Sequence, residues 1–145
     1  MDHIALMKKQ WKFLEKIISG EKTIESRWYK NASTPWRRCK KGDFVYFKNS
    51  GEPVSAKAEI VNVIHFSELN PKKIKQILNI YGKRIGIEKK DVLKFLKMFK
   101  DKKYCILVFL KNPKKIKPFE INKAGFGNMA AWITLPNINS IKSQG

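Results

Sequence analysis

A short segment near the start of the chain concentrates ionisable side chains. It reads Gly-Glu-Lys-Thr-Ile-Glu-Ser-Arg over residues 20–27 and contains Lys22, Glu25 and Arg27. An arginine can donate two parallel hydrogen bonds to a carboxylate or phosphate, and a lysine becomes a base or nucleophile when burial or a nearby cation lowers its pKa. The same three groups can also form an ion cluster that only fixes the backbone. The pattern therefore predicts either a ligand site or a structural cluster.

A helix and a strand are predicted on either side of these residues. Apolar residues at helical spacing predict a helix over residues 9–19. Residues 23–29 read as a strand, in which side chains two apart share a face. Glu25 and Arg27 then point the same way, and Lys22 lies at the bend, close enough to join them.

The rest of the chain alternates short strands with helices. Pro113 to Pro118 is predicted to be an extended crossing, and the tail from residue 136 to 145 to be polar and loose. We expect one α+β domain with its core over about residues 3–135. Its architecture is predicted to be a small, partly open β-barrel with an N-terminal helix and a helical insertion between strands. The further strands are predicted at residues 3–7, 44–48, 56–66, 104–110 and 132–135, and the inserted helices at 71–81 and 92–99.

The chain is strongly basic. Lys and Arg number 31 against 12 Asp and Glu, which gives a formal net charge of +19. Such an excess favours polyanionic partners, because neutralising phosphates releases condensed counterions. Much of the excess falls between residues 70 and 117. Lysine abundance can also reflect solvated helix faces, genome composition or adaptation to heat.

The cysteines and histidines give no sign of a metal site. Cys39 and Cys105 are far apart, and His3 and His65 are the only histidines. We therefore expect no zinc, no other metal, no cofactor and no disulfide framework. No signal peptide and no membrane-spanning run is visible, so a reduced, soluble, cytoplasmic protein is expected. His65 is interpreted as a core residue.

Aromatic and cationic residues alternate after the predicted strand. Trp28 and Trp36 lie close in sequence to Arg37 and Arg38. Exposed aromatic rings beside cations are typical of surfaces on which unpaired bases stack. We expect Trp36 to be the exposed ring, because it lies in a polar loop, whereas at least one of the tryptophans can simply pack in the core.

A second candidate loop follows Lys123. Two glycines flank Phe126, so backbone amides there can approach a ligand closely. A purely structural turn is the alternative. Asp43 is expected to cap a turn by accepting from backbone amides, and Trp132 to be a core residue.

A set of residues along the chain matches a known pattern. It consists of Gly20, Lys22, Glu25 and Arg27, then Gly42-Asp43, residues 105–110, residues 118–123 and Trp132. With the order of the elements, these residues resemble the ASCH domain of the PUA-like superfamily over roughly residues 4–135. The resemblance implies a barrel of five or six strands with a cleft lined by the first motif. Members of that family are generally thought to bind RNA or other nucleic acid.

Some small relatives in that family look like amidohydrolases that remove an acyl group from a modified cytidine. There, the lysine of the motif and a threonine three residues later carry the chemistry. Here Lys22 matches the lysine, whereas Glu25 stands at the position of the threonine.

Three hypotheses follow. The first is a nucleic-acid-binding module, for RNA, that recognises an unstacked or modified nucleotide in a basic barrel cleft. The second is a metal-independent amidohydrolase acting on an acylated cytidine-type nucleoside, with Lys22 and Glu25 as catalytic residues. The third is a structural or protein-interaction domain whose charge ensures solubility. Contacts to nucleic acid are predicted for Lys22, Glu25, Arg27, Trp28, Trp36, Arg37, Arg38, Lys123 and Phe126.

Overall fold

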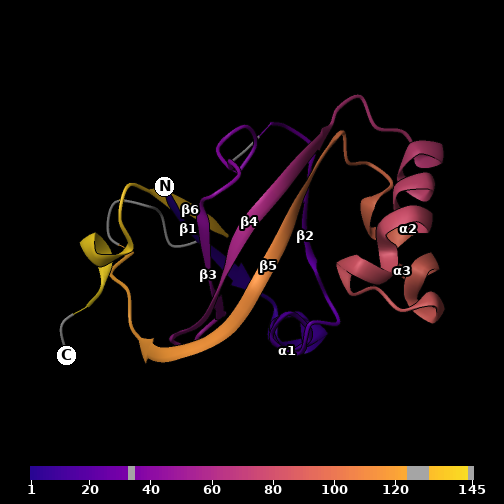
Figure 1. Cartoon of the computed structure of the whole chain (residues 1–145). Coiled ribbons are helices and arrows are strands. Elements are labelled where there is room, and N and C mark those ends of the chain that lie inside the picture. The colour runs from indigo at the N-terminus through magenta and orange to yellow at the C-terminus, as the bar shows by residue number, and fades with distance from the viewer. Residues whose placement is uncertain (33–34, 124–130, 144–145) are drawn as a thin grey trace.

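The computed structural model describes residues 1–32, 35–123 and 131–143 (Figure 1). Six strands in this part of the chain form one mixed sheet in the order β2-β5-β4-β3-β1-β6. The β1–β3 pair is parallel and the other neighbouring pairs are antiparallel. The sheet curves into a half-barrel, which confirms the predicted α+β class and partly open barrel. The strands are β1 (Asp2–Met7), β2 (Ile24–Tyr29), β3 (Phe44–Asn49), β4 (Val54–Phe66), β5 (Tyr104–Phe119) and β6 (Trp132–Leu135).

The long strand β5 has apolar residues on both faces. Ile106 and Val108 point into the half-barrel, whereas Cys105 and Leu107 pack against the inserted helices. A strand covered on both faces needs an uninterrupted apolar run, which is why residues 105–110 do not alternate with polar ones. The strand then continues through the segment predicted to be an extended crossing.

The helical insertion covers one side of the sheet. Helices α2 (Pro71–Ile85) and α3 (Val92–Phe99) connect β4 to β5 and pack beside β2 (Figure 1). Asn70 begins α2 by accepting a hydrogen bond from Lys73 N, with Pro71 in the first turn. The 3-10 turn η2 (Lys89–Asp91) precedes α3 in this connection, and a second 3-10 turn, η1 (Lys9–Trp11), follows β1 near the start of the chain.

The predicted helix over residues 9–19 is interrupted. The turn η1 ends at Lys12, whose φ of 58° is left-handed, and helix α1 spans only Phe13–Ser19. A lysine in that conformation is sterically disfavoured, so the sequence gives no sign of the break.

The C-terminal segment is not the loose tail that was predicted. It contains the 3-10 turn η3 (Ile138–Ile141), and the side chains of Ile138 and Ile141 are buried in a cluster with Ile4. Lys142 also forms a β-bridge with Ile121. Apolar residues at 138 and 141 anchor the segment despite its polar composition.

A buried polar network lies where β1 meets β6 and β3. Trp132 Nε1 donates to His3 Nδ1 over 3.2 Å, so Nδ1 carries no hydrogen, and Nε2 donates to Asp43 Oδ2 over 2.8 Å. Burial lowers the pKa of His3 below its ordinary 6.5, although Asp43 opposes this. Asp43 also accepts from Lys40 N, which confirms its predicted turn-capping role, and Trp132 is a core residue as predicted.

The neutral His3 makes the stability depend on pH. The unfolded chain takes up a proton on this side chain as pH falls through about 6.5. The folded protein takes it up only at a lower pH, because burial lowers the pKa of His3. We therefore expect the free energy of unfolding to decrease between pH 8 and pH 5.5. In urea unfolding at pH 8, His3→Gln should lower the free energy of unfolding by about 1–3 kcal/mol, because Trp132 Nε1 loses its acceptor. The free energy of unfolding of this variant should also change less steeply with pH. Burial and Arg37 also lower the pKa of His65, but that side chain is exposed, so His65→Gln should reduce the slope less than His3→Gln does. Equal slopes for all three proteins would contradict the assignment.

Candidate functional site

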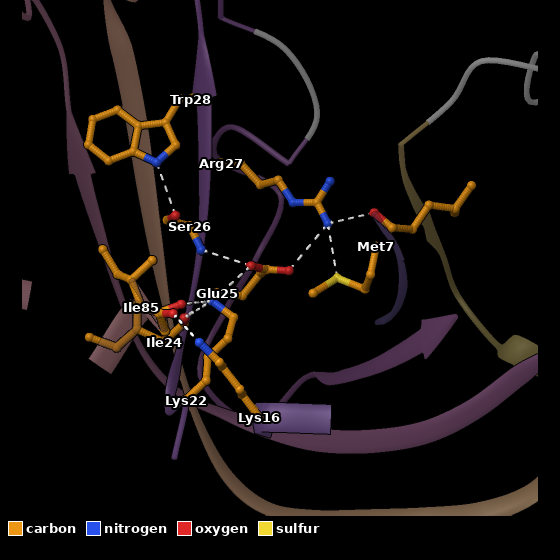
Figure 2. A network of polar contacts seen from close by, with 11 residues as sticks. Met7, Lys16, Lys22, Ile24, Glu25, Ser26, Arg27, Trp28 and Ile85 are labelled. Carbon is orange, nitrogen blue, oxygen red and sulfur yellow. Dashed lines mark hydrogen bonds and ion pairs between the residues drawn. The ribbon is translucent and has the colours of Figure 1, made fainter. Parts of the chain in front are cut away.

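Lys22 is the centre of the polar cluster and is almost fully buried, with 1% of its surface exposed. Its Nζ donates to Ile24 O and Ile85 O and lies 3.3 Å from Glu25 Oε1 (Figure 2). Three acceptors match the three hydrogens of an ammonium ion. The Nζ also lies 4.7 Å from the ring centroid of Phe13. The ion cluster allowed by the sequence is therefore present.

Lys22 joins β2 to the end of α2. Ile85 is the last residue of that helix, whose carbonyl end favours a cation, and Lys16 Nζ donates to the next carbonyl, Gly86 O. A Cβ added to Gly86 would lie 3.1 Å from Lys22 Cδ, so a glycine there leaves room for the lysine stem. The backbone of Thr23 is bonded to the same turn, with its N donating to Arg84 O.

Glu25 is held as a carboxylate. Its Oε1 accepts from Ser26 N as well as facing Lys22, and its Oε2 accepts from Arg27 Nη2 over 3.3 Å. Burial raises the pKa of Glu25, but Lys22, Arg27 and their hydrogen bonds outweigh it, so the pKa lies below its ordinary value. Burial lowers the pKa of Lys22, and the charge of Glu25 opposes that shift.

Arg27 bridges the opening of the half-barrel. Its Nη2 contacts Met7 Sδ (Figure 2) and donates to Leu6 O. Its Nη1 donates to Ala131 O. The guanidinium also lies over the ring of Trp132, 5.3 Å from the centroid. A side chain on the edge strand β2 thus contacts the end of β1 and the start of β6.

The free edge of β2 is partly occupied by these side chains. Among the described strands β2 pairs only with β5, and Thr23 O accepts from Leu110 N. Backbone groups alternate in direction along an antiparallel strand, so Ile24, Ser26 and Trp28 turn theirs toward the free edge. Lys22 bonds the first of these carbonyls, and Glu25 accepts from the N–H of Ser26.

A cavity of about 490 Å³ lies along this edge. Small-molecule sites in proteins typically span about 300–1,000 Å³. Glu25, Ser26 and Arg27 are its polar lining on β2, and Lys8 and Lys102 add positive charge. The aromatic residues that line it are Trp11, Phe13, Trp28, Phe95 and Phe99.

Solved structures with the same fold are known. ASCH from Zymomonas mobilis is similar at a TM-score of 0.68 and 14% identity, over 99% of this chain and 96% of that one. The N-terminal domain of McrB from Staphylothermus marinus is similar at a TM-score of 0.58 and 12% identity, over 96% of this chain and 90% of that one. The chain has the ASCH fold. No protein-family model and no curated protein matches the sequence.

Within this ASCH fold, the residues of the first motif take different positions relative to the cavity. Glu25 and Arg27 line it, whereas Lys22 lies beneath them and is not part of the lining. Trp28 also lines the cavity, but one face of its ring stacks on Phe99 at a centroid distance of 4.3 Å.

Trp36, Arg37 and Arg38 lie away from the cavity and do not line it. Trp36 is half-buried against the barrel core, so the prediction that it is exposed was wrong. Its ring packs edge-on against His65, which is exposed and not the predicted core residue, and whose Nε2 accepts from Arg37 N. The polar loop places its tryptophan inward because the ring covers the end of β4 and the start of β5.

The second predicted loop is only partly described. Lys123 ends the described segment that follows β5, and it does not line the cavity. Phe126 lies outside the described residues. Within the described ranges, no three His, Cys, Asp or Glu side chains gather as a metal site would require. The helices of those same ranges are too short or too polar to cross a bilayer.

Several cavity residues were missed by the sequence analysis. Trp11 lies in the predicted helix over residues 9–19, and Phe95 and Phe99 lie in the predicted helix over residues 92–99, so their apolar side chains gave no sign of a ligand site. These side chains do pack together, since the ring centroids of Trp11 and Phe95 lie 5.4 Å apart. The same aromatic rings also form one wall of the cavity. Ser26 and Lys102 carry no pattern that would mark them. Only their position around the edge of β2 identifies them.

Replacing Lys22 tests the cluster. Lys22→Met should lower the free energy of unfolding by about 3–5 kcal/mol, because it removes one partner of a buried ion pair. Adding Glu25→Gln should cost less than the sum of the single changes, with a coupling of about 0.5–3 kcal/mol. Lys97→Met, at an exposed position of α3, should change stability by about 0.5 kcal/mol or less. Additive losses in urea unfolding would show that the two groups do not interact.

Two glycines that end helices test the packing of the lysine stem. Gly20 and Gly86 both have left-handed φ, but only a Cβ at Gly86 would meet Lys22. Alanine at either position should cost about 1–2 kcal/mol through backbone strain. In thermal or urea unfolding, Gly86→Ala should therefore lower the stability of the protein more than Gly20→Ala does. Equal losses would mean that the lysine stem moves aside freely.

Proposed function

We propose that this chain is a nucleic-acid-binding module whose cavity receives one unstacked nucleotide of RNA. The observation that supports this most is the cavity itself, which combines aromatic walls with Glu25, Ser26 and Arg27 in a chain of net charge +19. Aromatic side chains stack on any base, and polar groups at the end of a pocket select among them. The fold shared with ASCH from Zymomonas mobilis supports the proposal.

The polar lining suits the edge of a base. Glu25 Oε2 accepts from Arg27 and retains a second lone pair, which can accept from an exocyclic amine. Ser26 Oγ accepts from Trp28 Nε1, so its own hydrogen can be donated to a ring nitrogen or carbonyl. A donor beside an acceptor on β2 favours a base that presents an amine next to a ring acceptor. The proposal thus includes a preference for amino-bearing bases, or modified forms of them.

The nucleic-acid backbone is proposed to follow the basic surface around the cavity. Lys8 and Lys102 line the cavity and would neutralise the nearest phosphates. The lysines of the helical insertion and of residues 111–117 would extend this contact, and Arg37 and Arg38 are exposed for contacts outside the cavity. Lys123 and Phe126 remain proposed contacts as well.

Amide hydrolysis is supported less well by the geometry. A catalytic lysine must reach the substrate in its neutral form. Lys22 is beneath the cavity lining, and its three hydrogens face Ile24 O, Ile85 O and Glu25. This arrangement favours a role for Lys22 in holding Glu25, and hence favours binding over turnover.

The proposal predicts salt-sensitive binding that depends on the cavity wall. In fluorescence anisotropy, mixed-sequence single-stranded RNA octamers should bind with a slope of log K against log salt of about −0.7 per phosphate contacted. Trp11→Leu should weaken the free energy of RNA binding by about 1–3 kcal/mol, because the variant removes a surface on which a base would stack. Trp36→Leu is the matched control, since this tryptophan is also half-buried but lies outside the cavity, and should bind nearly as wild type.

Three outcomes would count against this proposal. Absence of binding at low salt would remove the function altogether. Equal affinity for the matching DNA octamers would remove the preference for RNA. A loss confined to Trp36→Leu would place the base at the loop that carries Arg37 and Arg38.

A further inference from the structure

A second cavity of about 320 Å³ adjoins the first. The two share four lining residues, which come from the turn before α1, the first residue of α1, the segment after α2 and the helix α3. Three of the four are aromatic, and their rings lie 5.4–6.3 Å apart, so an aromatic wall separates the cavities. The shared residues are Trp11, Phe13, Ile87 and Phe95.

Most of the charged side chains that line the second cavity are basic. Lys16 and Lys90 both form ion pairs with Glu88, and Lys16 also donates to Gly86 O. Lys12 and Lys94 are exposed and form no ion pair with any residue in the described ranges. Asp91 is the other acidic residue of the lining. Four lysines against two acids leave the cavity positively charged.

Lys12 is in a conformation that a glycine would adopt more easily. Its φ of 58° lies in the left-handed region, at the break between η1 and α1. A non-glycine residue there is strained by about 1–2 kcal/mol. Such strain tends to persist where a side chain is needed for function. At this break the side chain of Lys12 lines the second cavity.

We infer that the ligand is a single strand of at least two nucleotides, with a base in the first cavity and the adjoining phosphate in the second. The strand would cross the Trp11 wall, and Lys12 and Lys94 would bind the phosphate. This inference rests on the proposed function and specifies its substrate class, a nucleic-acid strand as opposed to a free nucleoside. It also assigns the second cavity, which the base-binding proposal leaves without a role.

Matched lysine variants on one helix test the assignment. Lys94→Ala and Lys97→Ala remove the same charge from exposed positions of α3, but only Lys94 lines the second cavity. With the four homopolymeric RNA tetranucleotides as probes, Lys94→Ala should weaken the best binder by up to about fivefold. It should also reduce the salt slope by about 0.7. Lys97→Ala should change both quantities less, because Lys97 lines neither cavity and would contact only a longer strand. Equal effects of the two variants would overturn the inference.

Removing the phosphate charge completes the test. A tetranucleotide with neutral methylphosphonate linkages should bind Lys94→Ala and the wild type equally, because the charge that Lys94 contacts is gone. Lys12→Gly should weaken the charged tetranucleotide while leaving the melting temperature unchanged or higher, since a glycine relieves the left-handed strain. Asn112→Gly, which changes another left-handed residue outside both cavities, should leave binding unchanged.

The two proposals fail in different ways. Free nucleosides can bind as tightly as tetranucleotides while neither Lys94→Ala nor Lys12→Gly weakens binding of the tetranucleotide. In that case the inference of a two-nucleotide strand is wrong, and the proposed base pocket is unaffected. If neither nucleosides nor tetranucleotides bind at low salt, the proposed function fails and this inference fails with it.

Discussion

The buried ammonium of Lys22 holds together the elements that form the candidate site. It contacts a carbonyl of β2, the last carbonyl of α2 and the carboxylate of Glu25. Burying a charge away from water raises the free energy of the folded state, and only complete hydrogen bonding and a close counter-ion offset this desolvation penalty. Here both conditions are met. The cluster therefore fixes where the helical insertion lies against β2, and this relation determines the width of the cavity between them.

The cavity exists because the half-barrel is not closed. Its lining includes residues from the end of β1, the start of α1, the edge strand β2, the end of α2, helix α3 and Ala131, several of which are distant in sequence. Arg27 spans the opening through Leu6 O and Ala131 O without filling it. A fully closed barrel would have no free strand edge on which a ligand could lie. The open barrel and the insertion beside it thus produce one concave surface with charged and aromatic parts.

Much of this arrangement could be predicted from sequence, and the rest depends on contacts between distant residues. The spacing of Lys22, Glu25 and Arg27 predicted that their side chains would lie together, and the sequence predicted the strand over residues 104–110. The sequence did not show that Lys22 lies beneath the cavity, because its burial depends on Gly86, more than sixty residues away. The exposed position of His65 and the break at Lys12 were equally hidden, since tertiary packing overrides local preference there.

The free edge of β2 has a consequence for association between copies of the chain. Unpaired strand edges readily recruit strands from neighbouring molecules and so start aggregation. On β2, Lys22 already bonds Ile24 O, and Glu25 accepts from Ser26 N, while a guanidinium covers the adjacent opening. A foreign strand would find these positions taken and would have to desolvate buried charges to displace them. The polar cluster thereby hinders polymerisation of identical molecules through their sheets, while the cavity beside the same edge stays open.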